Sequence, residues 1–257
     1  MSIKIMLDAG HYGYRNQSPV VKEYYESRRM WMLCEYLYEE LLSYGIEAFK
    51  TRTDIERDLA LEKRGKMAKG CDMFISLHSN AVSSSGSEET DRVSVYAPYD
   101  NRNNSHKLAS QLAETVRECM GVSKAYVKTR KSEKGNYEYY GVLRGAARAG
   151  CPLYYIVEHS FHTNAYAAKW LLNDENLRLL AKREAETITD YFGIVKEIKK
   201  GDIDMNGKID ANDIISLKRY NMGTLDFTPE QEILADIDEN GKVDICDYIT
   251  LKREYMK

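Results

Sequence analysis

The chain has 257 residues, of which 43% are hydrophobic and 30% are charged, with only 4 Pro and 16 Gly. This composition excludes a disordered, collagen-like or low-complexity chain, and the length suits one large domain or two unequal ones. The formal net charge of −3 argues against nucleic acid as the main partner. No uncharged apolar run approaches the ~18 residues that a membrane span needs.

The first 193 residues alternate short apolar runs with amphipathic segments. Runs rich in Ile, Val, Leu or Tyr predict strands at 3–8, 46–51, 73–77, 92–97 and 153–158. Apolar residues at helical spacing predict helices over about 30–41 (ending before Gly45), 108–120 and 165–192. Polar loops are expected at 82–91 and 128–141. This alternation predicts an α/β domain with a mostly parallel, twisted sheet flanked by helices.

The pattern changes after Gly193, where an internal repeat follows. DIDMNGKIDANDIISLKRY (202–220) recurs as DIDENGKVDICDYITLKRE (236–254), displaced by 34 residues. Each copy has oxygen-bearing side chains at loop positions 1, 3, 5, 9 and 12, a Gly at 6 and a Lys carbonyl at 7. Such spacing surrounds one Ca²⁺ with oxygens, so two structural calcium ions are expected. The expected ligands are Asp202, Asp204, Asn206, Lys208, Asp210 and Asp213, then Asp236, Asp238, Asn240, Lys242, Asp244 and Asp247.

These loop–helix repeats, each ending in Lys-Arg, resemble a type I dockerin. Position 12 is Asp where an EF-hand would have Glu, and no entering helix is evident before either loop. The resemblance implies a small all-α domain at 202–257, following a basic linker at 194–201. It also implies a cohesin module as partner, or self-association. Positions 10 and 11 (Ala211-Asn212 and Ile245-Cys246) depart from the Ser-Thr pair that is usual in cohesin recognition.

Three predicted strands in the first domain end in residues able to bind a metal. His11 follows the first strand, His78 follows the third, and Glu158 ends the last. Because the carboxyl ends of parallel strands meet at one edge of a sheet, these side chains are expected to converge. Imidazoles with a carboxylate suit Zn²⁺. Residue type alone leaves open whether the histidines merely cap the strands.

The same segments resemble the zinc-dependent N-acetylmuramoyl-L-alanine amidases of the Amidase_3 class, over residues 1–193. The matching motif positions are Asp8, Gly10, His11, Gly13, His78, Asn80, Glu158, Phe161 and Asn164. The resemblance implies one catalytic zinc ion held by His, Glu and His. It further implies Glu158 as general acid and base, and peptidoglycan as substrate, cleaved between N-acetylmuramic acid and L-alanine.

The glutamate ligand has two candidates. Glu23 and Glu26 are three residues apart and were expected to share one helix face, so periodicity does not separate them. Counting back from Gly45 in the register of the resembling family selects Glu26. Asn80, His159 and Arg144 are the expected substrate contacts.

Two other functions remain open at this point: a catalytically silent module that binds the wall and docks to a scaffold, or a zinc carboxypeptidase acting on stem peptides. The segment MSIKIMLDAG shows no signal peptide, so we expect synthesis in the cytoplasm and action on the bacterial wall after release, as for an endolysin. Residues 201–257 carry a net charge of −6, which leaves +3 for residues 1–200. A mildly basic catalytic domain suits an anionic wall, and no membrane partner is expected.

Overall fold

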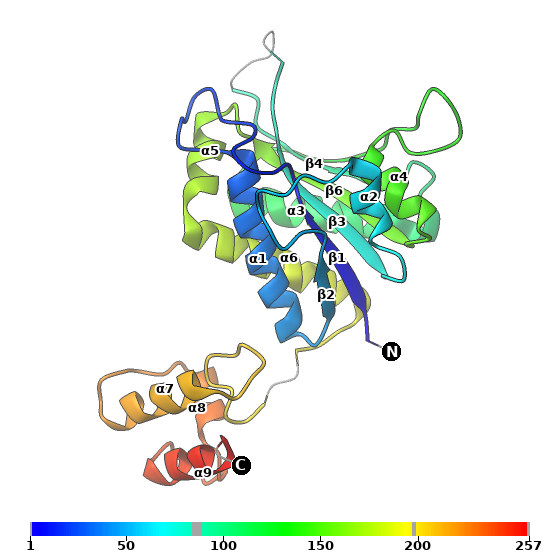
Figure 1. The fold of residues 1–257 in the computed structure, drawn as a ribbon. Helices are drawn as coiled ribbons and strands as arrows, with labels where there is room; N and C mark the ends of the chain where they lie inside the picture. Colours follow the sequence, from blue (N-terminus) through cyan, green and yellow to red (C-terminus); the bar gives the residue numbers. More distant parts are fainter. Residues whose placement is uncertain (1, 84–88, 197–198, 256–257) are drawn as a thin grey trace. The chain divides into compact units, whose positions relative to one another are not determined.

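The computed structural model describes residues 2–83, 89–196 and 199–255, which form two compact units (Figure 1). One unit comprises Met1–Leu41 and Ile46–Ile194, and the other comprises Leu42–Gly45 and Val195–Lys257. Residues 84–88 of the loop expected at 82–91, and residues 197 and 198 of the expected linker, lie outside the described residues. The domain limits at 193 and 202 therefore stay predictions.

The first unit is built on a six-stranded sheet with the strand order β2-β1-β3-β6-β4-β5. All neighbouring strands are parallel except β4 and β6, which confirms the expected mostly parallel α/β sheet. The sequence patterns did not predict the four-residue strand β5. The strands are β1 (Lys4–Ala9), β2 (Glu47–Lys50), β3 (Met73–Asn80), β4 (Val93–Tyr96), β5 (Ala125–Lys128) and β6 (Leu153–Phe161).

The last part of this unit contains two helices where one was expected. The single helix expected over 165–192 is wrong, because α5 (Ala165–Leu172) ends before Asn173 and α6 (Asp174–Phe192) begins after it. The Asn173 side chain accepts hydrogen bonds from two backbone N–H groups at the start of α6, which caps that helix. The other helices are α1 (Glu26–Ser43), α2 (Leu61–Lys66), α3 (Ser105–Met120) and α4 (Gly141–Arg148), with a 3₁₀ turn at Arg102–Asn104.

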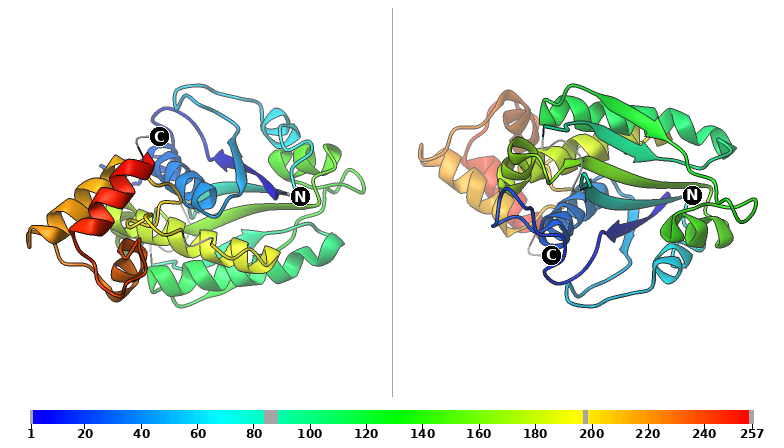
Figure 2. Two further views of the ribbon diagram at one scale, coloured as in Figure 1. Left: turned by 90° about the horizontal axis from the view of Figure 1, so that it is seen from below. Right: turned by 90° about the horizontal axis from the view of Figure 1, so that it is seen from above.

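Sequence patterns also missed α2 and α4, which are short and pack closely against each other. A Cβ atom added to Gly65 would lie only 1.9 Å from the carbonyl oxygen of Val142, so glycine is required for this approach. On the same side of the sheet, α4 packs over Phe74 and Tyr154. Helix α3 contacts β4, β5 and β6 from the opposite side, as the two views of Figure 2 show. Within the described residues, no helix is long and apolar enough to cross a membrane.

The second unit contains α7 (Ala211–Asn221), α8 (Pro229–Ala235) and α9 (Ile245–Tyr255). Its small core is built from Ile203, Leu217, Ala235 and Leu251. The expectation that no helix enters either loop is wrong for the second loop, because α8 ends directly before Asp236. Helix α8 was not predicted because it lies between the two repeats. Thr228 caps its start and Pro229 is its first residue.

Candidate functional site

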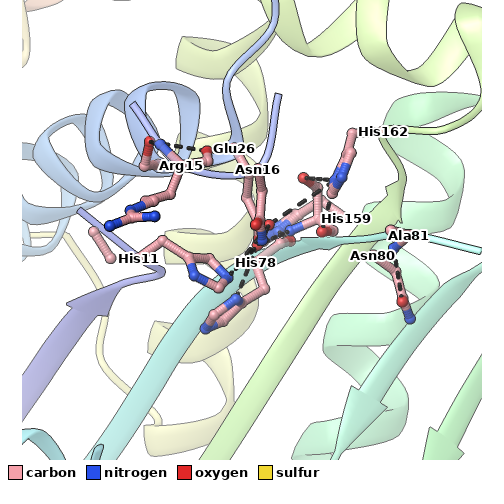
Figure 3. Close-up of polar contacts among 12 residues, drawn as sticks. His11, Arg15, Asn16, Glu26, His78, Asn80, Ala81, His159 and His162 are labelled. Atoms are coloured by element: carbon pink, nitrogen blue, oxygen red, sulfur yellow. Dashed lines mark hydrogen bonds and ion pairs between the residues drawn. The ribbon is translucent and has the colours of Figure 1, made fainter. Parts of the chain in front are cut away.

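His11, Glu26 and His78 meet at the carboxyl ends of β1 and β3, with their candidate ligand atoms within 4.8 Å of one another (Figure 3). Glu26 Oε1 lies 2.9 Å from His78 Nδ1, and Glu26 Oε2 lies 3.4 Å from His11 Nε2. Glu26 is the first residue of α1 and is buried. Glu23 is exposed and precedes the helix, so the expected shared helix face does not exist. The structure therefore brings Glu26 to the histidines and leaves Glu23 outside the group.

The turn after β1 explains why glycine precedes His11. The Gly10 N–H donates a 2.9 Å hydrogen bond to the Leu77 carbonyl, which draws this turn against β3. A Cβ atom at Gly10 would lie 2.6 Å from the His78 ring, so any larger residue would displace a candidate ligand. His11 itself has a φ of 55°, in the left-handed region, which ends the strand at this point.

Residues 10–25 fold back over the start of α1 and bring Asn16 to the site. The Glu26 N–H donates to the Asn16 carbonyl at 3.0 Å. The Asn16 Nδ2 group donates to Glu26 Oε2 at 2.7 Å and lies 3.0 Å from His11 Nε2 (Figure 3). No sequence motif pointed to Asn16, because only the folding of this loop brings it beside Glu26. Its amide fixes the orientation of the Glu26 carboxylate.

Electrostatics keep the Glu26 carboxylate ionised. Burial raises its pKa, but hydrogen bonding and charge from His78, the charge of His11 and the Asn16 hydrogen bond outweigh burial and lower the pKa to about 2. Burial lowers the pKa of His78, but the hydrogen bond and the charge of Glu26 outweigh burial, so the pKa of His78 is raised. An ionised carboxylate between two imidazoles is the donor set that a zinc ion accepts.

Glu158 lies beside this group on β6. It is the registered neighbour of His78 on β3, so the two side chains project from the same face of the sheet. Glu158 Oε2 is buried and has no hydrogen-bond partner among the described residues. Burial, assisted by the negative charge of Glu26 and opposed by His78, raises the pKa of Glu158 to about 7. A carboxyl group that titrates near neutrality is suited to exchanging protons.

A buried ion pair between Asp8 and Arg64 stabilises the carboxyl end of β1. Asp8 accepts hydrogen bonds from Arg64 Nε at 2.8 Å and from Arg64 Nη2 at 2.6 Å, and further ones from Thr51 and Ser76. Arg64 Nη2 also donates to the Ala9 carbonyl at 2.9 Å. Burial raises the pKa of Asp8, but the attraction of Arg64 outweighs it, so the pKa is lowered. Asp8 was noted only as a motif position, and the structure shows it paired with an arginine of α2.

The three expected substrate contacts lie in different surroundings. His159 is fully buried, with Nε2 3.2 Å from Glu184 of α6 and Nδ1 2.8 Å from the His78 carbonyl. The expected contact of His159 with substrate does not fit this position, since alternation along β6 directs it away from the face of Glu158. Asn80 is half-buried and accepts a hydrogen bond from the Ala81 N–H at 2.8 Å, and its role in substrate binding stays a prediction.

Arg144, on α4, is engaged by the protein itself. Its Nε donates to Glu62 at 2.5 Å, and its Nη1 donates to the carbonyls of Glu138 and Tyr139, each at 3.0 Å. It lines a cavity of about 660 Å³ together with Tyr137 and Tyr139. No described contact joins Arg144 to the metal-binding group, so its substrate contact stays a prediction.

His162 belongs to a buried network behind Glu26. Its Nδ1 lies 3.0 Å from both the Oγ and the carbonyl of Ser79, and Ser79 Oγ lies 2.7 Å from the Tyr24 hydroxyl. The Ser79 N–H donates to Glu26 Oε1 at 3.1 Å. Through the Ser79 N–H this network holds Glu26 Oε1, whereas Asn16 holds Oε2.

The two acidic loops of the second unit have the same internal geometry. Asp202, Asp204 and Asp213 form one carboxylate group within 4.8 Å, and Asp236, Asp238 and Asp247 form the other. Asp213 Oδ1 accepts from the Ile203 N–H at 2.8 Å, and Asp247 Oδ1 accepts from the Ile237 N–H at 2.7 Å. Four of the other expected ligands accept backbone hydrogen bonds within the same loops: Asn206 from Lys208, Asn240 from Lys242, Asp210 from Asn212, and Asp244 from Cys246. Lys208 and Lys242, whose carbonyls are the expected ligands, donate in these contacts through their N–H groups.

Clustering of carboxylates is unfavourable without a cation. Burial, with a contribution from the charge of Asp204, raises the pKa of both Asp202 and Asp213. A divalent cation with oxygen ligands relieves this repulsion, and the carboxylates present suit calcium.

Comparisons with known proteins agree with this geometry. Residues 5–190 match the family model of N-acetylmuramoyl-L-alanine amidases (Amidase_3), and residues 200–255 match the type I dockerin domain. A search of curated proteins found no match.

Solved structures show the same fold at low sequence identity. The catalytic domain of CwlV, an N-acetylmuramoyl-L-alanine amidase from Bacillus (Paenibacillus) polymyxa var. colistinus, is 21% identical with a TM-score of 0.60, over 75% of this chain and 99% of that one. An N-acetylmuramoyl-L-alanine amidase from Clostridium difficile 630 is 19% identical with a TM-score of 0.63, over 75% and 97%. Cwp6 from Clostridium difficile is 22% identical with a TM-score of 0.61, over 74% of this chain and only 29% of that one.

Proposed function

This chain belongs to the N-acetylmuramoyl-L-alanine amidase family, and we propose that it cleaves peptidoglycan between N-acetylmuramic acid and L-alanine with one zinc ion at His11, Glu26 and His78. The observation that carries this proposal is the meeting of two imidazoles and one carboxylate at the strand ends, beside a buried glutamate. Three protein ligands leave further coordination positions open, as a catalytic zinc site requires.

Different residues of the chain would bind the metal, transfer the proton and orient the metal ligand during amide cleavage. A zinc ion held here would lower the pKa of a coordinated water toward ~7 and polarise the scissile carbonyl. Glu158 takes the proton of the attacking water and returns it to the leaving nitrogen, for which a pKa of about 7 is well matched. Asn16 and Ser79 hold the Glu26 carboxylate in place by hydrogen bonds of 2.7 Å and 3.1 Å.

The two alternative functions would give different products from purified sacculi. A catalytically silent wall-binding module would release no fragment from purified sacculi. A zinc carboxypeptidase would shorten stem peptides from their carboxyl ends and leave the lactyl amide intact. An amidase releases stem peptides that begin with L-alanine, which mass spectrometry identifies directly. We place its action at the bacterial wall, and an endolysin role stays a prediction.

Replacing Glu26 by glutamine is expected to weaken zinc binding by more than about 100-fold, since this removes the only anionic ligand of the group. Chelator competition with the full-length chain measures the affinity. Glu23→Gln is the matched control, because Glu23 is exposed and outside the group. Equal loss of affinity in both variants, or no loss in Glu26→Gln, would reject the assignment of Glu26.

We further propose that the second unit binds two calcium ions and docks to a cohesin module. The match of residues 200–255 to the type I dockerin domain supports this, as do the two carboxylate groups with identical internal geometry. At the two recognition positions, Ala211-Asn212 and Ile245-Cys246 stand in place of the usual Ser-Thr pair.

Calcium removal is expected to reduce helical order in residues 202–255 while the first unit stays folded. The cause is that six carboxylates in two groups repel one another without a cation. Hydrogen exchange of the full-length chain, with calcium or with a calcium chelator, reports each unit separately. Asp213→Ala and Asp247→Ala should each remove one of two calcium equivalents, whereas the exposed Asp226→Ala should remove none. Unchanged exchange without calcium would contradict the proposal.

A further inference from the structure

The sheet face that carries Glu158 continues across β4 and β5. Glu158 is the registered neighbour of Ser94 on β4, which in turn pairs with Tyr126 on β5. The next row consists of Ile156, Tyr96 and Lys128. Since registered neighbours project from one face, these side chains lie on the same side as Glu158, and α3 covers the opposite side. Tyr126 is 42% exposed, so this part of the face is open.

Two cationic side chains, Arg92 and Lys128, lie on either side of the row that contains Glu158 and Ser94. Lys128 Nζ is 5.7 Å from the centre of the Tyr96 ring and 6.0 Å from that of Tyr126. Arg92 directly precedes β4, and its guanidinium carbon is 4.9 Å from the centre of the Phe161 ring. A hydrogen bond of 2.6 Å from Ser160 Oγ to Asp91 holds this end of β4 against β6.

Neither cation is neutralised within the part of the chain that the structure describes. No ion pair joins Arg92 or Lys128 to a carboxylate there. Burial, followed by the positive charge of Arg92, lowers the pKa of Lys128, and Glu158 acts on it in the opposite sense. Lys128 is therefore within electrostatic reach of both Arg92 and Glu158.

Polar atoms without partners lie between these cations. Ser94 is fully buried, and its Oγ has no hydrogen-bond partner among the described residues, as is also true of Glu158 Oε2. Buried polar atoms normally have a partner, so these two neighbours leave hydrogen-bonding capacity unused beside the cations.

We propose that Arg92 and Lys128 form a subsite for a carboxylate of the stem peptide, on the leaving-group side of the scissile amide. This rests on the proposed function, in which Glu158 protonates the leaving nitrogen. The peptide that begins at this nitrogen must therefore start next to Glu158, where both cations lie. Stem peptides carry free carboxylates beyond L-alanine, and a cation that forms no ion pair among the described residues can bind such a group with a charge-assisted hydrogen bond.

The first test compares two muropeptide substrates that differ in one group, a stem whose second residue has a free α-carboxylate and the same stem with that group amidated. Lys128→Met is expected to lower kcat/KM for the carboxylate substrate by about 10–100-fold, mainly through KM, and to leave the amidated substrate nearly unchanged. Lys124→Met is the matched control, because Lys124 is exposed just before β5. An equal loss on both substrates, or no loss on either, overturns the subsite.

The second test does not depend on turnover. Calorimetry measures binding of the free stem peptide to the full-length chain, with wild type, Lys128→Met and Lys124→Met compared. The expected result is weaker binding by about 10-fold or more in Lys128→Met alone. Unchanged binding in Lys128→Met overturns the subsite even if wild type cleaves both substrates. If wild type cleaves neither substrate, the proposed function fails, and the binding comparison still decides the subsite.

Discussion

Replacing Glu158 by glutamine is expected to lower kcat for amide cleavage by about 10²–10⁴-fold while the full-length chain keeps its zinc. The amide is nearly isosteric with the carboxylate but neither accepts a proton from water nor returns one to the leaving nitrogen. Glu158 lies beside His78 without a hydrogen bond to it among the described contacts, so its loss leaves the three candidate ligands in place. Mass spectrometry of digested sacculi measures the cleavage, and metal analysis measures the zinc.

The matched control for this change is Glu175→Gln, because Glu175 is exposed in the first turn of α6. It should keep full activity. Zinc lost together with activity in Glu158→Gln would make Glu158 a ligand, and activity retained in that variant would refute its role as general acid and base. These outcomes separate catalysis from metal binding.

Replacing Asp8 by asparagine is expected to destabilise the first unit by about 3–5 kcal/mol. The change removes the partner of Arg64, whose side chain is only 5% exposed and would then carry an uncompensated buried charge. Both tryptophans, Trp31 and Trp170, lie in the first unit, so tryptophan fluorescence during denaturant unfolding of the full-length chain reports this unit.

Asp174→Asn provides the comparison for Asp8→Asn. Asp174 pairs with Arg29 at 2.6 Å, but its side chain is 59% exposed, so the expected loss is below about 1 kcal/mol. A double variant, Asp8→Asn with Arg64→Met, should lose less stability than the sum of the two single changes, since it removes both charges. A loss for Asp8→Asn as small as that for Asp174→Asn would contradict the argument from burial.

The two largest expected effects concern different properties of one edge of the sheet. Asp8 and Arg64 hold the end of β1, including the Ala9 carbonyl two residues before His11. Glu158 acts two strands away and contributes to no such support. Stability of the edge and chemistry at the edge are therefore separable by mutation, although both depend on the register of β1, β3 and β6.

Several elements were predictable because their signals are local. The strands β1, β3 and β6 are long apolar runs, and α1 and α3 repeat their apolar residues at helical spacing. Among the short elements, β2 and β4 were predicted, whereas α2, α4, α8 and β5 were not. The break at Asn173 was not predicted, because apolar residues recur on both sides of it and suggest one continuous helix.

The type of sheet, the doubled acidic loops, and the family motifs that contain His11, His78 and Glu158 can be recognised from the order of the residues alone. These features follow from spacing along the chain, which fixes periodicity and loop geometry directly. The choice of Glu26 over Glu23, the contact of Asn16 with the Glu26 carboxylate, the burial of His159 and the pairing of Asp8 with Arg64 became evident only in three dimensions. The same is true of the position of Lys128 near Arg92 and Glu158. Each of these relations depends on strand order, register and the path of a loop, which set contacts between residues far apart in the chain and leave no repeating pattern within it.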